Sequence, residues 1–312
     1  MGIKIFADAA SNLFKDFLKK KDLDIKVMNM HLTVGDKEYN CYDDDLNIEE
    51  FSKEYYKKIG EGVKTRTSLI SPGEYVEAFE KEVEKGNKII CFTMAKGISG
   101  TYNSACIARD EINEKYKSEM VYVVDSITAG FGEGMQAIHA CELVKQGKDF
   151  DYIKQEAESF KHITRSEFTV DNIKYLISTG RASKALARFI HLLKIKIMLK
   201  NSEESKIAFA GAVPGRKNSI KRLAKLVNEK FDYSIDQTLY LTHCDCINET
   251  NELAEMLRES GVKNIEIQPY DLISGSHIGP NSIAVFYIAK KEEEKPSLIR
   301  RIIKRKEQEN GK

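Results

Sequence analysis

The 312-residue sequence lacks an excess of charge of one sign, a long apolar run and a leader-like N-terminus. Its 49 Lys and Arg nearly balance its 48 Asp and Glu. Because these charges are interspersed and nucleic-acid binding needs a clustered basic face, the composition argues against a nucleic-acid partner. No uncharged apolar stretch is long enough to cross a bilayer, and the opening MGIKIFADAA lacks the charged and apolar regions of a signal peptide. These absences predict a soluble, cytoplasmic protein.

The spaced ligand pairs of a zinc site and the common nucleotide-binding patterns are also missing. Six cysteines are scattered along the chain, and without a secretory signal we expect reduced thiols. The HCDC segment offers His243, Cys244 and Cys246 to a soft metal, but no second Cys pair completes four ligands. Neither glycine-bearing turn supplies the Lys of a P-loop, and the glycines of residues 130–134 are spaced wrongly for a dinucleotide fingerprint. We therefore interpret the thiols as buried, and predict no metal site and no cofactor.

The first half of the chain alternates short apolar runs with amphipathic segments, which predicts a mainly parallel sheet flanked by helices. The predicted strands are residues 3–8, 25–34, 88–94 and 120–125, and the predicted helices are residues 13–20, 48–59, 73–86, 106–117 and 135–147. TVGDKEYN, residues 33–40, carries a Gly-Asp turn and predicts a short hairpin on that sheet. Loops that carry function are expected at the carboxyl ends of the parallel strands.

The rhythm changes near residue 160, after which strands follow one another with fewer helices between them. The predicted strands are residues 167–172, 195–200, 205–214, 238–243, 264–272 and 282–290, with helices at 181–194, 219–231 and 249–260. Some of these strands are adjacent in sequence, so the second sheet is expected to be mixed. We predict a two-domain α/β fold, residues 1–160 and 161–290, followed by a charged tail, residues 291–312, with the apolar spacing of a helix.

GISGTYNSA, residues 97–105, places small polar residues where a strand hands over to a helix. Ser99 and Gly100 offer an O–H donor, backbone N–H groups and the positive end of a helix dipole, which together suit an anion. Three further stretches put small polar residues after an apolar run: RTSLISPGEY with Thr67 and Ser68, VVDSITAGFGEG with Asp125 and Ser126, and GSHIGPNS with His277. The first three of the four stretches would converge at one sheet edge if their strands are neighbours. The alternative is that they are N-caps and tight turns.

An enzymatic interpretation also fits some of these residues. Gly97 to Thr101 comes close to the Gly-x-Ser-x-Gly nucleophile elbow, but Thr101 occupies the second glycine position. Ser99, His277 and Asp125 would then form a hydrolase triad, so a serine-dependent lipid esterase that uses Ser99 is the alternative function. Arg181 follows a glycine and is either a surface residue or a carboxylate clamp.

The order of the motifs resembles that of the DegV family, the fatty-acid-binding proteins also called FakB. From about residue 4 to residue 289, TSLISPGEY is similar to the family's TSQPSxGEF, GISGTYNSA to LSGTYxSA, VVDSITAGFGEG to VxDSxxxSxGxG, STGRAS to GGRIS, AVPGRKNSIKRL to VRTRKKALxxL and HIGPNS to HxGPG. The chain departs from the family pattern at Leu69 and Ile70, which replace Gln-Pro, at Ala9 and Thr179, and at Asn281, which replaces the last Gly of HxGPG.

The resemblance implies a long-chain fatty acid buried between two domains, with its carboxylate bound by Thr67, Ser99 and His277. It places Ser68, Gly100 and Arg181 near that carboxylate and Ser126 behind them. A partner, an ATP-dependent fatty acid kinase, would phosphorylate the bound carboxylate to an acyl phosphate, and this chain would be the carrier subunit without a catalytic base. We expect neutral donors at the site, with a protonated His as a further option.

Two basic segments are candidates for contact with partners. Arg216 and Lys217 lie in a basic cluster at the start of a predicted helix, where the family pattern is basic too. We interpret the cluster as a contact for the kinase or an anionic lipid surface, or else as a solvated helix face. In the tail, residues 297–305 place apolar residues on one side and basic residues on the other. This pattern predicts either a docked terminal helix or transient association with an anionic membrane.

Overall fold

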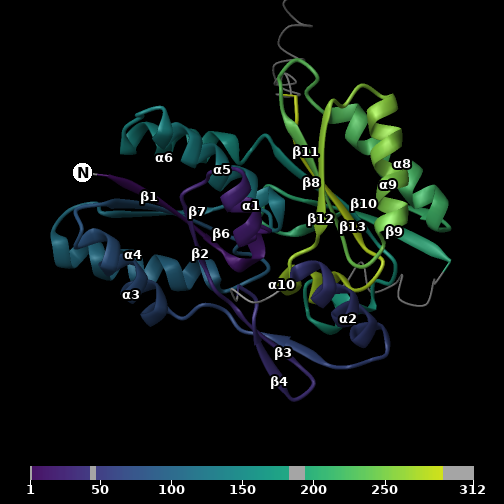
Figure 1. Ribbon diagram of the computed structural model, residues 1–312, viewed down its shortest axis with the longest axis horizontal. Coiled ribbons are helices and arrows are strands. Elements are labelled where there is room, and N and C mark those ends of the chain that lie inside the picture. The colour runs from purple at the N-terminus through teal and green to yellow at the C-terminus, as the bar shows by residue number, and fades with distance from the viewer. Residues whose placement is uncertain (1, 43–46, 183–193, 291–312) are drawn as a thin grey trace, which may run out of the picture.

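Two β-sheets of different kinds follow each other along the chain (Figure 1). The computed structural model describes residues 2–42, 47–182 and 194–290. The predicted tail helix, and all but the ends of the helix predicted at 181–194, therefore lie outside the described residues. Within the described ranges, no helix is both long enough and apolar enough to cross a membrane.

The first sheet is entirely parallel, with the order β2-β1-β6-β7, as the strand and helix alternation predicts. Its strands are β1 (Ile3–Asp8), β2 (Ile25–Met28), β6 (Lys88–Thr93) and β7 (Val121–Asp125). The helices of the first half of the chain are α1 (Lys15–Lys20), α2 (Ile48–Gly60), α3 (Pro72–Val83), α4 (Thr101–Tyr116), α5 (Phe131–Lys145) and α6 (Phe150–Phe160), of which α2 packs on α10 (Leu272–Ile278) and β12 (Asn264–Pro269) of the second half. The α3–α4 pair contacts β6 and β7, and α5 packs on β1, β2 and β6. The predicted α/β architecture of the first half is confirmed.

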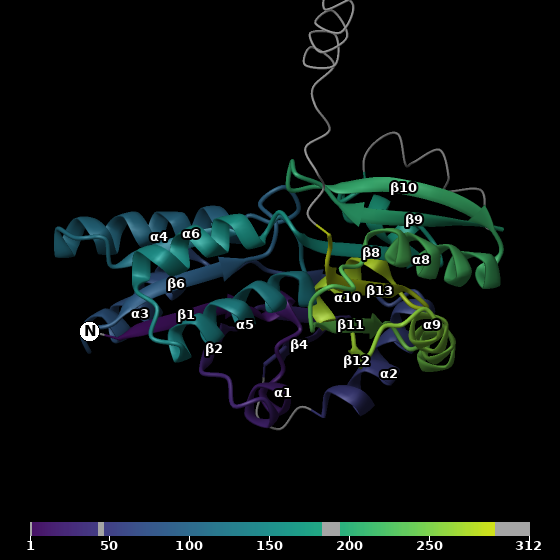
Figure 2. The same cartoon turned by 90° about the horizontal axis from the view of Figure 1, so that it is seen from above.

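The second sheet is mixed, with the order β10-β9-β8-β13-β11-β12, and only β11 and β12 are parallel (Figure 2). Its strands are β8 (Thr164–Val170), β9 (Ile195–Asn201), β10 (Ile207–Pro214), β11 (Thr238–His243), β12 (Asn264–Pro269) and β13 (Ile283–Ile288). Helices α8 (Arg216–Lys230) and α9 (Ile247–Glu259) pack on one another, and α8 also contacts β8, β9 and β10. The partly antiparallel sheet predicted for the second half is therefore confirmed.

The prediction of one strand over residues 25–34 is wrong. The chain leaves the parallel sheet after β2, and β3 (His31–Val34) pairs with β4 (Lys37–Asn40) and β5 (Thr65–Thr67) in a separate antiparallel sheet. The predicted hairpin at 33–40 exists, but on this sheet and not on the parallel one. Alternate residues of β3 are buried, which is typical of a sheet with one solvated face, whereas a central parallel strand is covered on both faces.

Two short helices were not predicted, α7 (Lys174–Ser178) and α10 (Leu272–Ile278), because they are too short to show a periodic pattern. Helix α10 begins where the strand predicted at 264–272 was expected to continue, because Asp271 caps it by accepting a hydrogen bond from the Ser274 N–H at 2.6 Å. It packs against α2, α7, β5 and the 3-10 turn η1 (Ala9–Ser11). His277 therefore lies on a helix and not on a turn.

One hydrophobic core extends across both sheets. The ring of Phe131 on α5 stacks on Tyr240 of β11 at 4.3 Å between centroids and meets Phe286 of β13 edge-on at 6.4 Å. The elements of the parallel sheet end with Phe160, and β8 begins at Thr164. The division into domains near residue 160 stays a prediction.

Candidate ligand-binding site

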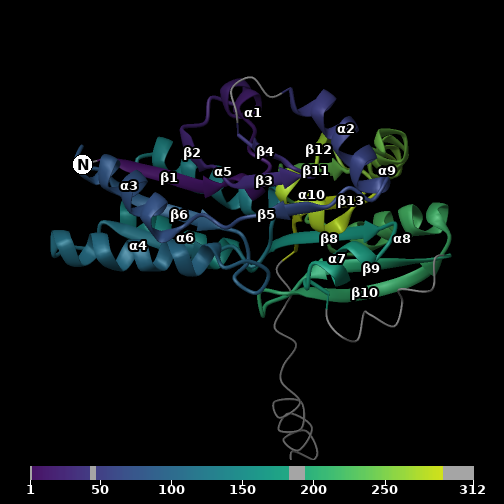
Figure 3. The same ribbon diagram turned by 90° about the horizontal axis from the view of Figure 1, so that it is seen from below.

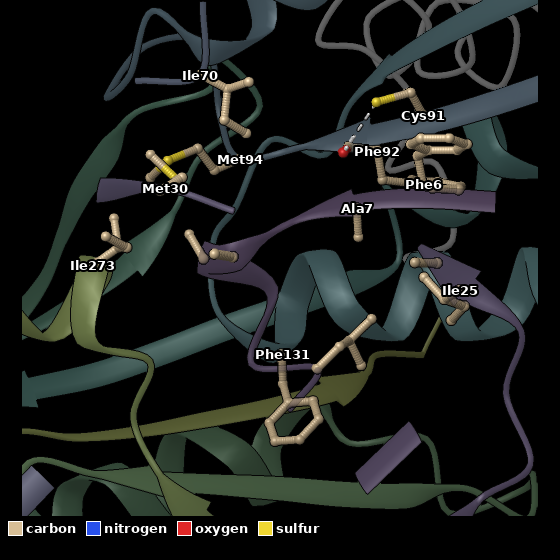
Figure 4. Close-up of a cluster of buried hydrophobic side chains, with 14 of the residues drawn as sticks. Phe6, Ala7, Ile25, Met30, Ile70, Cys91, Phe92, Met94, Phe131 and Ile273 are labelled. Atoms are coloured by element: carbon tan, nitrogen blue, oxygen red, sulfur yellow. Dashed lines mark hydrogen bonds between the residues drawn. The ribbon is translucent and has the colours of Figure 1, made fainter. Parts of the chain in front are cut away.

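A pocket is lined by residues from the carboxyl ends of the parallel strands, from α10 and from the β8–β9–β10 edge of the mixed sheet. Figure 3 shows where these elements lie in the fold. The pocket's empty space, counted out to the opening and including open solvent there, is about 930 Å³. Most of its wall is apolar, and Figure 4 draws three of those residues, Met30, Met94 and Ile273, beside the core residue Ile70. Among the residues predicted for the site, the pocket brings together Thr67, Ser99, Gly100, Arg181 and His277.

Thr67 and His277 meet although 210 positions separate them in the chain. Thr67 ends β5 and His277 lies in the last turn of α10, and the threonine hydroxyl is 3.2 Å from Nε2 of the imidazole. Burial and the nearby Arg181 lower the pKa of His277 to about 3. The imidazole is therefore neutral at pH 7 in this structure, and a protonated His beside a bound carboxylate stays a prediction.

Ser99 occupies the turn from β6 into α4, as GISGTYNSA predicts. Its hydroxyl oxygen is 2.9 Å from Oγ1 of Thr101 and accepts a hydrogen bond from the Thr101 N–H at 3.2 Å. Gly100 precedes the first residue of α4, so the positive end of that helix adjoins the pocket. A Cβ at position 100 would lie 2.9 Å from Cδ2 of Leu69, so a larger residue there would displace the end of this exposed side chain.

Arg181 brings a cation to the same pocket. Its guanidinium donates to the backbone carbonyl of Ile98 at 3.2 Å and to that of Thr179 at 2.5 Å, and burial lowers its pKa. No carboxylate pairs with it within the described ranges. An arginine stays charged in proteins, so the pocket contains a half-buried positive charge without a counterion.

Ser126 supports the pocket from behind. It is fully buried, its hydroxyl donates to the Thr128 carbonyl at 3.1 Å, and it accepts from the Thr128 N–H at 3.3 Å. These bonds shape the wall that Ile127, Thr128 and Ala129 contribute, whereas Ser126 itself does not line the pocket. Ser68 is exposed and does not line the pocket, and its backbone N–H donates to the His31 carbonyl at 3.1 Å.

The hydrolase triad is not assembled. The Asp125 carboxylate accepts hydrogen bonds from Ser205 and from the backbone N–H groups of Lys96 and Ile127. In the described structure, no hydrogen bond joins Asp125 to His277 or His277 to Ser99. The prediction that three serine-containing turns share one sheet edge is also wrong in part, because Thr67 belongs to the separate antiparallel sheet.

The other predicted residues lie outside the pocket. Arg216 begins α8 half-buried and donates to the Cys246 sulfur at 3.6 Å, while Lys217 is exposed. Cys244 and Cys246 are buried, as interpreted from the sequence. Within the ranges that the structure describes, no cluster of three His, Cys, Asp or Glu residues is placed to hold a metal ion.

Several lining residues could not be found from the sequence. Tyr270 and Ser274 come from α10 and the segment before it, and Ser166, Asn201 and Lys206 come from the β8–β9–β10 edge. None belongs to a recognisable motif: Ser166, Asn201 and Ser274 are ordinary strand or helix residues, Lys206 and Tyr270 lie in connecting segments, and the tertiary structure brings all five to the pocket.

A family model described as "Uncharacterised protein, DegV family" matches residues 2–290. The chain belongs to the DegV family. A DegV domain-containing protein of Clostridium perfringens is 34% identical over 290 residues, which cover 93% of this chain and 98% of that protein.

Solved DegV structures share the fold. A DegV family protein from Thermus thermophilus, described as fatty-acid-binding, has a TM-score of 0.80 at 22% identity and covers 93% of this chain and 100% of its own. The fatty acid kinase B3 protein of Streptococcus pneumoniae, loaded with linoleic acid, has a TM-score of 0.77 at 20% identity over 93% of this chain and 100% of its own.

Proposed function

We propose that this DegV protein binds a long-chain fatty acid in the pocket and presents its carboxylate to an ATP-dependent fatty acid kinase. The observation that carries the proposal is the convergence on a largely apolar pocket of two hydroxyls, a neutral imidazole and one guanidinium that has no carboxylate partner among the described residues. The fatty acids in the related solved structures support the same ligand class.

The polar groups suit a carboxylate, which is an acceptor only. If His277 donates from Nε2 to the Thr67 oxygen, the threonine O–H is free to donate to the ligand, and Ser99 supplies a second O–H. Arg181 adds charge complementarity beside them. Burial of the acyl chain contributes about 0.8 kcal/mol per CH2, so the apolar wall supplies most of the affinity and the polar end fixes the orientation.

The chemistry assigned to the partner needs no base from this chain. The fatty acid carboxylate is already ionised at neutral pH, so its oxygen can attack the γ-phosphorus of ATP directly, the bond to the ADP oxygen breaks, and an acyl phosphate results. Because His277 is neutral and its pKa is low, it is suited to donate a hydrogen bond and not to accept a proton.

The most direct test is mass spectrometry of the denatured purified protein, in which we expect a copurified long-chain fatty acid. A serine-directed fluorophosphonate should leave Ser99 unlabelled, because no imidazole of the described residues is hydrogen-bonded to it. Labelling at Ser99 without copurified lipid would favour an esterase and contradict the proposal.

Removal of one polar contact should weaken binding without unfolding the protein. We expect Ser99→Ala and Thr67→Ala each to raise the dissociation constant for oleate about 10- to 100-fold, since a hydrogen bond to a charged group contributes about 1.5–3 kcal/mol. Thr65→Ala is the matched control, because Thr65 lies on the same strand and does not line the pocket. Unchanged affinity in both site variants would refute the carboxylate assignment.

We further propose that the start of α8 contacts the kinase. Because Arg216 is half-buried, Lys217 is the better probe, and Lys217→Glu is expected to reduce acyl phosphate formation several-fold at unchanged fatty acid content. Lys225→Glu, at an exposed position two turns further along α8, is the control. Equal rates of acyl phosphate formation in the two variants and the wild type would contradict this contact. Transient association with an anionic membrane through residues 291–312 stays a prediction.

A further inference from the structure

The two sides of the pocket are joined to each other unequally. At α10, Asn12 bridges to the Pro269 carbonyl and the Asp271 N–H, Tyr55 donates to the Leu272 carbonyl, and α10 packs on α2, β5 and η1 of the first half. Across the opposite side, in the described residues, the hydrogen bonds between the first and second halves are those of Arg181 with Ile98 and of Ser205 with Asp125.

Ser205 is an unusual residue for a hairpin turn. It lies in the β9–β10 turn, residues 202–206, between the exposed residues Glu204 and Lys206, yet only 1% of its surface is accessible. Its hydroxyl is 2.7 Å from each oxygen of the Asp125 carboxylate. Its φ of 61° is left-handed, a conformation that disfavours serine, so the position does not owe its serine to the backbone.

The turn also presses on the loop that carries Ser99. A Cβ on Gly97 would lie 2.2 Å from the Ser205 carbonyl oxygen, so only glycine permits this close contact. The Asp125 carboxylate accepts a hydrogen bond from the Lys96 N–H at 3.2 Å, in the same loop. It accepts another from the Ile127 N–H at 3.1 Å, in the segment 127–129 that also lines the pocket. The Asp125 carboxylate is therefore hydrogen-bonded to three segments that line the pocket.

The exposed lining residues mark the pocket opening. They are Leu69, which is 45% exposed, and Lys206, which immediately follows Ser205. The turn thus lies at the rim, and its one side-chain bond to the first half is the bond to Asp125 in the part of the chain that the structure describes.

We propose that Ser205 and Asp125 form a latch that holds the β9–β10 turn across the pocket opening, and that its release admits and discharges the acyl ligand. Ser205 is a positioning residue in this account and does not touch the ligand. The identity of the ligand rests on the proposed function, whereas the latch itself is a property of the turn. We expect the pocket to open by rotation of the two halves about its α10 side, where the hydrogen bonds between the halves remain.

Stopped-flow kinetics with a dansyl-labelled fatty acid tests the latch. Loss of a hydrogen bond to a charged group should raise the population of the open state about tenfold, so Ser205→Ala and Ser205→Gly should raise both the association and the dissociation rates about tenfold. The dissociation constant should stay nearly unchanged, because the latch is closed with or without ligand. Alanine retains the left-handed strain and glycine removes it, so agreement between the two assigns the effect to the hydroxyl.

Ser234→Ala is the matched control. Ser234 donates to Asp232 at 2.6 Å in a surface turn that does not line the pocket, so its removal also deletes a serine–aspartate hydrogen bond. Unchanged rates in both Ser205 variants would overturn the latch. A faster dissociation matched by an equal loss of affinity would also overturn it, because Ser205 would then stabilise the bound state alone.

A ligand-free measurement separates the latch from the proposed function. Trypsin cleavage after Lys206, followed by intact-protein mass spectrometry, should be about tenfold faster in both Ser205 variants than in wild type and Ser234→Ala. If the wild-type protein binds no fatty acid but this difference appears, the proposed function fails and the latch stands. Equal cleavage in all four proteins would overturn the latch whatever the ligand.

Discussion

Gly279→Ala is expected to lower the free energy of unfolding by about 2–4 kcal/mol. Gly279 ends α10 with a φ of 79°, and a Cβ there would lie 2.2 Å from Cδ2 and 2.6 Å from Cγ of Tyr175 on α7. Atoms so close to the Tyr175 backbone cannot move aside without a shift of α7 itself. The cost therefore combines about 1 kcal/mol of backbone strain with about 1–3 kcal/mol of steric overlap.

Gly215→Ala separates the two contributions. Gly215 has a φ of 77° and a ψ of 154°, close to the 79° and 174° of Gly279, but a Cβ at this position would have no neighbour within 4 Å, so only the strain of about 1 kcal/mol is expected. Urea unfolding followed by circular dichroism measures both variants. Adding Tyr175→Ala to Gly279→Ala should recover the steric part in a double-mutant cycle. Equal losses in the two glycine variants would show that the tyrosine ring yields freely.

Glu133→Gln is expected to stabilise the protein above pH 7 and to have little effect near pH 4. Glu133 is fully buried on α5, where one carboxyl oxygen accepts the Asp8 N–H at 3.0 Å and the other has no partner among the described residues. Burial, and then the neighbouring Asp8, raise the pKa of Glu133 well above its ordinary value. Asp271, whose pKa is also raised by burial, lies in the same environment, as do the buried Tyr75 hydroxyl and Cys91 thiol.

The sign follows from proton linkage. Above pH 4.5 the unfolded chain releases the Glu133 proton while the folded protein retains it, so the wild-type protein loses stability as the pH rises. Glutamine has no such proton, and its carbonyl can still accept the Asp8 N–H. The Glu133→Gln variant should still lose stability with rising pH because of Asp8. Burial raises the pKa of Asp8 from 3.8 to about 6, which corresponds to a decrease of about 3 kcal/mol in the free energy of unfolding between pH 4 and 6.

Glu82→Gln provides a control of opposite sign. Glu82 is also buried on a helix, but hydrogen bonds from Lys85 and Asn87 lower its pKa, so its ionised form is favoured in the folded state. Its replacement should therefore decrease stability at pH 8. Urea denaturation at several pH values from 4 to 8 tests both. A Glu133→Gln protein less stable than wild type at pH 8 would contradict a protonated, buried Glu133.

The sequence was informative where periodicity is strong and where a turn has a chemical reason. Runs such as IKIFAD and KIICFTM are long enough to identify buried strands, and GISGTYNSA correctly locates Ser99 at a strand-to-helix turn. Ser71 illustrates the alternative interpretation of such residues, because it caps α3 in a capping box with Glu74 and has no role in the pocket.

The site itself depends on long-range packing that no local pattern contains. Strand β5 has three residues and α10 has seven, both too short for a periodic signal, yet they bring Thr67 and His277 together. The family resemblance supplied that pairing, whereas the residues alone supplied only four separate turns. The low pKa of His277 depends on burial and on Arg181, both consequences of the tertiary structure.

The central place of β13 in the mixed sheet has a consequence for synthesis on the ribosome. It is the last described strand to leave the ribosome, yet it lies between β8 and β11 and joins β8–β10 to β11–β12. β8 ends at Val170 and β13 ends at Ile288. At a translation rate of about 5–20 residues per second, β13 is completed roughly 6–24 s after β8, its partner strand. During that time the nascent chain presents open strand edges, which invite pairing with other chains. We expect translation speed and chaperone supply to set the yield of this protein.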